Sequence, residues 1–151
     1  MLSKAPQDLG PLTPRVSLMA HNFFSPQPIT NASAYLLRQV THNWNDQDCV
    51  RILKAVVPGL EKSEKGTPLL INEIVLPEIG HGGAQMVNKY QEKRLRQVDI
   101  MMMVALGAKQ RTENEFRKLL KEADVRLEVS SMLIGHQVLS IPDTSRLTKK
   151  I

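Results

Sequence analysis

The sequence predicts an α/β protein with a mostly parallel sheet that ends in an antiparallel pair of strands. Residues 34–40 and 69–76 are nearly continuous in apolar side chains, which is typical of parallel strands buried on both faces. An amphipathic segment of helical period separates these two runs, and two more helical segments follow them. Residues 127–134 and 137–141 are the last apolar runs, and Gly135-His136 between them is typical of a tight hairpin.

The start of the chain predicts a leader, a short strand and a loop. Residues 1–14 carry three prolines and no periodic pattern, so we predict a loose leader there. Residues 16–20 are mostly apolar and predict a first strand. Pro26 and Pro28 then predict a loop, because proline cannot donate a backbone hydrogen bond to a sheet.

Capping patterns place the helices. Asn45 is a favourable N-cap residue, and the apolar side chains after it recur at helical spacing. Residues 91–106 have the pattern of a second helix. Thr112 and Glu115 form a capping-box pattern, which predicts the start of a third helix. The predicted order is therefore β-β-α-β-α-α-β-β, without an internal repeat.

Composition and charge narrow the classes of function. The chain has 151 residues, of which 42% are hydrophobic and 23% charged, as in a globular domain. Its net charge is +5, but the basic residues are scattered and aromatic residues make up only 4%, so we expect no nucleic-acid partner. No apolar run approaches the roughly 18 residues of a membrane span, and no signal-peptide pattern is present. The single Cys49 fits a reducing compartment, the cytoplasm.

Two polar residues at the predicted parallel strands are candidates for chemistry. His42 follows the run 34–40, at the strand end where open α/β sheets bind ligands. Glu73 interrupts the second apolar run, and a buried carboxylate must be paired or neutralised. Its partner is either His42 or an arginine such as Arg38 or Arg111. Taken alone, His42 is more often a capping or core histidine than a catalytic one.

Five motifs occur in the order and spacing of a known family. They are Asn22-Phe23-Phe24, residues 35–46 with His42-Asn43-Trp44, residues 72–77 with Glu73, residues 99–102 from Asp99, and residues 110–116 from Gln110. Together they resemble the C-terminal catalytic part of the cation-independent, plant-caffeate-type O-methyltransferases, above all the fungal branch. The resemblance covers about residues 15–142. It implies a partial Rossmann-like class I methyltransferase sheet, with the last four strands and a terminal antiparallel hairpin.

The resemblance also implies a chemistry and a set of site residues. His42 is then the general base that takes the proton from a substrate hydroxyl, and Glu73 is the carboxylate that orients it. The oxygen displaces the methyl group of S-adenosyl-L-methionine, and no metal is required. The other implied site residues are cofactor contacts at Asn22, Phe23 and Arg38, and acceptor-pocket positions at Asp99, Met102, Met103 and Gln110.

The implied organisation is a leader over residues 1–14, a catalytic segment over residues 15–143 and a tail over residues 144–151. The implied partner is a small hydroxylated aromatic substrate. A homodimer is expected only together with the N-terminal dimerisation domain of the family, which this sequence lacks.

Three departures from the family pattern keep a second hypothesis open. The glycine-rich cofactor loop is absent, Asn22 stands where an acid is usual, and Gln110 stands where a second carboxylate often flanks the histidine. The alternative is an inactive methyltransferase fragment that serves as an interaction module or has no function. A basic nucleic-acid-binding domain ranks third, because the sequence shows no cluster of lysine and arginine that would form its binding face.

Overall fold

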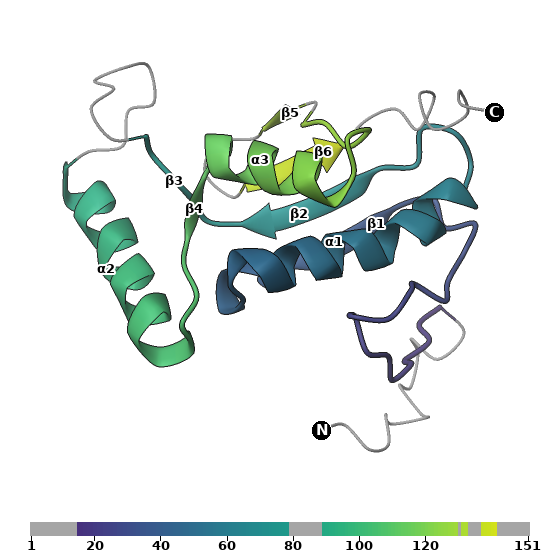
Figure 1. Ribbon diagram of the computed structural model, residues 1–151, viewed down its shortest axis with the longest axis horizontal. Helices are drawn as coiled ribbons and strands as arrows, with labels where there is room; N and C mark the ends of the chain where they lie inside the picture. Colours follow the sequence, from purple (N-terminus) through teal and green to yellow (C-terminus); the bar gives the residue numbers. More distant parts are fainter. Residues whose placement is uncertain (1–14, 79–88, 130, 133–136, 142–151) are drawn as a thin grey trace.

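The computed structural model describes residues 15–78, 89–129, 131–132 and 137–141. Each of the three described α-helices lies between strands in the chain, as Figure 1 shows. The elements are β1 (Tyr35–Arg38), the 3-10 turn η2 (Thr41–Asn43), α1 (Asp46–Glu61), β2 (Leu69–Glu73), β3 (Val75–Leu76), α2 (Lys89–Leu106), β4 (Arg111–Thr112), α3 (Glu113–Ala123), β5 (Ser131–Met132) and β6 (Gln137–Ile141).

The described strands form a sheet of four and a sheet of two. In the larger sheet the order is β1-β2-β6-β5. β1 and β2 are parallel, with Tyr35 opposite Leu69, and α1 forms the crossover that parallel strands need. β6 is antiparallel to β2, and β5 is antiparallel to β6. β3 and β4 form the second sheet and are parallel.

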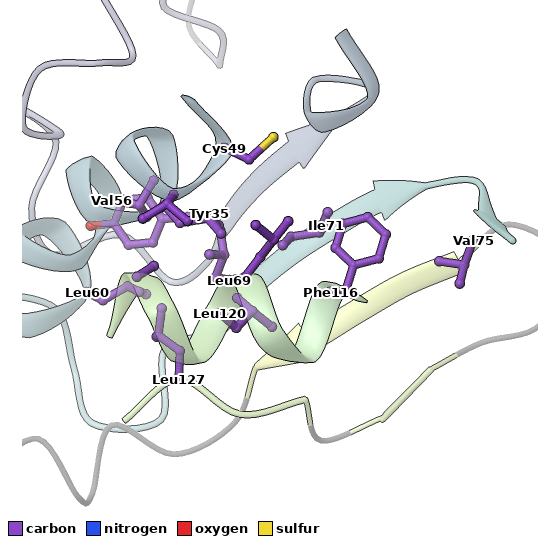
Figure 2. Packing of buried hydrophobic residues seen from close by; sticks show 14 residues of the cluster. Tyr35, Cys49, Val56, Leu60, Leu69, Ile71, Val75, Phe116, Leu120 and Leu127 are labelled. Atoms are coloured by element: carbon purple, nitrogen blue, oxygen red, sulfur yellow. The ribbon is translucent and has the colours of Figure 1, made fainter. Parts of the chain in front are cut away.

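The core lies between the larger sheet and the helices α1 and α3. These two helices pack beside each other over the sheet (Figure 1). Along β2 the side chains alternate, so that Leu69, Ile71 and Glu73 are buried and the two between them are half-buried. Figure 2 shows how Leu69 and Ile71 meet Phe116 and Leu120 of α3. Packing of these apolar side chains fixes the sheet against both helices.

Local capping explains where α1 and α3 begin. The Asn45 side chain accepts a hydrogen bond from the N–H of Asp48 at 2.9 Å, as the sequence predicts. Thr112 and Glu115 form the predicted capping box at the start of α3. The predicted second helix is confirmed as α2, which ends at Leu106 and is followed by Gly107 in the left-handed conformation, with a φ of 63°.

The strand predictions are partly wrong. Residues 16–20 form no strand. Their apolar side chains are exposed, so pairing with the sheet would bury no apolar face here. The predicted strand 69–76 is divided at Ile74 into β2 and β3, which join different sheets. Residues 127–129 lie outside any strand. The predicted burial of both sheet faces is also wrong within the described residues, because Leu36 is 58% exposed on the face away from Tyr35.

Three predicted features lie outside the described residues: the leader 1–14, the turn at Gly135-His136 and the tail 144–151. Within the described part of the chain, no helix is long and apolar enough to span a membrane.

Candidate functional site

The backbone reverses sharply after β1. Gln39 has a φ of 52°, in the left-handed region that costs a non-glycine residue about 1–2 kcal/mol. Its N–H donates to the carbonyl of Asn72 at 2.9 Å, which continues the pairing of β1 with β2. The single turn η2 follows and carries His42 toward the carboxyl end of β2. The strained residue thus directs the histidine toward Glu73.

His42 and the buried Glu73 form a partly buried hydrogen-bonded pair. The distance from His42 Nδ1 to Glu73 Oε2 is 2.7 Å. The Glu73 side chain is 1% exposed, whereas that of His42 is 20% exposed. A carboxylate only accepts hydrogen bonds, so the proton of the neutral ring lies on Nδ1. The other ring nitrogen, Nε2, is then free to accept a proton.

The second oxygen of Glu73 is also fully engaged. Oε1 accepts hydrogen bonds from the N–H of Thr41 at 2.7 Å and from its hydroxyl at 3.0 Å. These contacts explain how a carboxylate can be buried here, because its charge is met by three donors. The partners of Glu73 are therefore Thr41 and His42, and the arginine alternative is not realised.

Arg111 holds the turn from the opposite side. This residue is 1% exposed and binds Asp46 through Nε and Nη2, at 2.9 and 2.8 Å. Nη1 donates to the carbonyl of Thr41 and Nη2 to that of Trp44, both at 2.8 Å. The sequence suggests Arg111 only as a partner for Glu73. Its real acceptors are mainly backbone carbonyls, which leave no side-chain pattern in the sequence.

Asp46 links this arginine to a second cation. Lys109 Nζ lies 3.1 Å from Asp46 Oδ2 and 2.8 Å from Glu115 Oε1. Partial burial opposes the ionised form of Asp46, but hydrogen bonds and charges from Arg111 and Lys109 outweigh it and lower its pKa. The carboxylate therefore stays ionised and anchors both cations beside the turn.

Cys49 packs against the same turn and has a weakly acidic, unreactive thiol. Its Sγ is 3.3 Å from the Thr41 carbonyl and 3.5 Å from the Trp44 carbonyl. Burial raises the pKa of the thiol to about 11. The side chain is completely buried in the core.

An aromatic cluster brings the predicted cofactor motif to the turn. Phe23 and Phe24 pack edge-on against Trp44, with ring centroids 5.6 and 4.9 Å away. Phe23 keeps 38% of its surface exposed. The Asn22 side chain is exposed and accepts a hydrogen bond from the N–H of Phe24 at 3.1 Å. Arg38 is also exposed, at the end of β1.

The predicted acceptor-pocket residues lie on α2 and just after it, and α2 lies next to η2. Asp99 Oδ1 accepts a hydrogen bond from the N–H of Gln110 at 2.7 Å, so these two are brought together. Gln110 is 3% exposed, and its Oε1 is the only buried side-chain polar atom without a partner among the described residues. Met102 is half-buried and Met103 is 59% exposed. Their roles in a pocket stay predictions.

The sequence is similar to a known domain family and to named relatives. The sequence model of the O-methyltransferase domain matches residues 1–126. O-methyltransferase sol2 of Alternaria solani is 54% identical over 123 residues, which are 82% of this chain and 28% of that protein. The 6-hydroxytryprostatin B O-methyltransferase of Aspergillus fumigatus is 39% identical over 82% of this chain and 33% of its own length.

A solved structure agrees with the fold. OxaC in complex with SAH and oxaline superposes with a TM-score of 0.63, at 28% identity, over 82% of this chain and 29% of OxaC. The chain thus spans about a third or less of the length of these three proteins. Since the domain model covers most of its residues, this chain belongs to the O-methyltransferase domain family.

Proposed function

We propose that the protein containing this chain transfers a methyl group from S-adenosyl-L-methionine to a hydroxyl of a small aromatic molecule, with His42 as general base. The hydrogen bond between His42 Nδ1 and Glu73 Oε2 carries this proposal, together with the partial exposure of the histidine ring. Relatives named O-methyltransferases and the OxaC complex with SAH support it.

The chemistry assigned to the pair is a proton transfer coupled to methyl transfer. His42 Nε2 takes the hydroxyl proton of the acceptor while the acceptor oxygen forms its new bond to the methyl carbon. The ionised Glu73 beside Nδ1 stabilises the imidazolium that results. The bound methyl donor supplies an activated methyl group on a sulfonium, whose carbon–sulfur bond breaks. The proton then leaves Nε2 for solvent.

The exposed Phe23 fits a methyl donor that carries an adenosine. Its ring is packed edge-on against Trp44, two residues after His42, and keeps an open surface on which a base can stack. Asn22 and Arg38 offer exposed polar groups at the same end of the sheet. We assign cofactor contacts to these three residues, and acceptor contacts to Asp99, Met102, Met103 and Gln110.

The four strands of the larger sheet are proposed as the last four of a Rossmann-like methyltransferase sheet. The parallel pair joined by α1, followed by the antiparallel β6, supports this placement. We expect the whole protein to act in the cytoplasm on small molecules, without nucleic acid or membrane, and to form a homodimer only if it contains the N-terminal domain of the family.

A methylation assay on the full-length protein tests this function. With a panel of phenols and S-adenosyl-L-methionine, His42→Ala should lower kcat by about 10²–10⁴-fold, the usual range for loss of a general base. Calorimetric binding of S-adenosylhomocysteine should persist in that variant. An unchanged kcat in His42→Ala would disprove the assignment of the base.

The second candidate is an inactive module that binds another protein. The observation that favours it is α2, which has no buried residue and exposes several large apolar side chains. A folded protein that neither binds S-adenosylhomocysteine nor methylates any phenol would favour this candidate.

A further inference from the structure

Arg111 is buried behind the His42 turn and does not face the reacting groups. We propose that Arg111 is a positioning residue that holds His42 Nδ1 on Glu73 by fixing the backbone on both sides of the histidine. This inference rests on the proposed role of His42 as the base.

The Arg111 guanidinium binds the backbone on both sides of His42. It donates to the carbonyl of Thr41, one residue before the histidine, and to that of Trp44, two residues after it, each at 2.8 Å. Thr41 is held at its other end by Glu73, which accepts from its N–H at 2.7 Å. An arginine fork is planar and rigid, so it fixes the spacing of the two carbonyls. The peptide units around His42 therefore have one position relative to Glu73.

The backbone also ties Arg111 to Glu73. Arg111 begins β4, where it lies opposite Val75 of β3. Val75 is only two residues beyond Glu73, the last residue of β2. The ladder between β3 and β4 thus sets the arginine and the carboxylate at a fixed separation. The turn is held between them, by the carboxylate at one end and the guanidinium at the other.

The charge of Arg111 is neutralised by Asp46 and not by Glu73, the partner of His42. Asp46 accepts two of its hydrogen bonds, at 2.9 and 2.8 Å, and the pKa of Asp46 is lowered, so this carboxylate is ionised. No hydrogen bond or ion pair joins Arg111 to Glu73, whose oxygens accept from Thr41 and His42. Arg111 can therefore order the turn without competing for the carboxylate that the histidine needs.

The decisive experiment compares Arg111→Lys with Arg126→Lys in the full-length protein. Lysine keeps the charge and most of the stem, but one ammonium cannot reach two carbonyls and Asp46 together. Arg126 serves as the control, because its guanidinium binds the carboxylates of Asp124 and Glu61 and no hydrogen bond joins it to Thr41, His42 or Trp44. Imidazole ¹⁵N spectra report the tautomer of His42.

We expect Arg111→Lys to stay folded and to lose the dominance of the Nδ1–H tautomer, with a fall in kcat of about 100-fold. The KM for the methyl donor should change by less than about twofold, because the cofactor contacts are untouched. Arg126→Lys should match the wild type in both readouts. A folded Arg111→Lys with the wild-type tautomer and kcat would overturn the proposal.

A second variant decides the case in which Arg111→Lys does not fold. Asp46→Ala removes the anchor of the arginine from a side chain that is 50% exposed, so the fold should survive. It should shift the tautomer in the same direction by a smaller amount, and an unchanged tautomer would overturn the proposal. The tautomer readout requires no methyl transfer. Failure of the proposed function would therefore appear as an inactive wild type, independently of the result for Arg111.

Discussion

The His42 turn and the helix α2 lie next to each other but are held in opposite ways. In the turn, polar groups of Thr41, His42 and Trp44 are bound by Glu73 and Arg111. In α2 no residue is buried, although the Arg96 side chain donates to the Pro77 carbonyl at 2.7 Å. The proposed base is thus pre-organised by this chain itself. The proposed acceptor helix has no buried residue, so we expect it to open more easily than the turn.

The largest expected contrast concerns one glutamate from each region. Glu73→Ala leaves the Thr41 N–H, its hydroxyl and His42 Nδ1 without their acceptor. We expect the free energy of unfolding to fall by about 3 kcal/mol, since buried bonds to a charged group are lost. Glu92→Ala in α2 removes a half-exposed ion pair with Arg96 at 3.3 Å and should cost less than about 1 kcal/mol. Urea denaturation of both variants measures the difference, and equal losses would refute the contrast.

A pair of exposed glutamines isolates the effect of backbone conformation. Gln39 is in the left-handed region, with a φ of 52°, whereas Gln97 lies within α2. A β-branched side chain is poorly tolerated at positive φ, so Gln39→Val should destabilise the protein by about 1–2 kcal/mol. Gln97→Val should cost about 0.5 kcal/mol or less from helix propensity alone. Thermal denaturation compares the two, and a smaller loss at Gln39 would mean that its conformation carries no strain.

Features that depend on short-range sequence were predictable, and those that depend on distant partners were less so. Asn45 and the pair Thr112 and Glu115 cap their own helices, so their patterns identify α1 and α3. The strand predicted at residues 16–20 failed because a strand needs a neighbour, which the apolar run alone cannot supply.

The same distinction applies to the site. His42 and Glu73 are 31 residues apart, and their pairing was inferred from the family resemblance and from two adjacent strand ends. Arg111 was missed as a partner of the turn because it binds the carbonyls of Thr41 and Trp44, and any residue type supplies a carbonyl. The sequence signal for this role is an arginine directly before the capping-box residue Thr112.

A smaller effect should appear at acid pH through the Asp46 carboxylate beside the turn. The pKa of Asp46 is lowered in the folded protein from an ordinary value of 3.8. Its contribution to stability is therefore present above about pH 4 and is lost as the pH falls through the lower, folded pKa. Half-exposed ion pairs contribute less than about 1 kcal/mol, so the loss is modest.

Asp46→Asn tests this dependence. The variant should be less stable than the wild type at pH 7, and the difference should shrink as the pH is lowered below about 4. Unfolding free energies measured from pH 2.5 to 7 give the comparison. A difference that stays constant over this range would show that the charge of Asp46 does not stabilise the turn.

The smallest effect is expected for apolar side chains of α2. Val104 is 77% exposed and Ile100 is 57% exposed, so replacement by glutamine removes little buried surface. Val104→Gln and Ile100→Gln should each change the free energy of unfolding of the 151-residue chain by less than about 0.5 kcal/mol. Leu120→Gln in α3 is the matched control, because Leu120 is completely buried and should cost several times more.

The same substitutions in a longer protein would show what covers α2. If another domain or a second copy packs on this helix, Val104→Gln should destabilise the longer protein by more than about 1 kcal/mol while leaving the 151-residue chain unaffected. The turn should respond alike in both, because Glu73 and Arg111 hold it from within this chain. An effect of Val104→Gln that is equal and small in both proteins would mean that α2 stays exposed, and the acceptor site would then have to be formed without a cover over this helix.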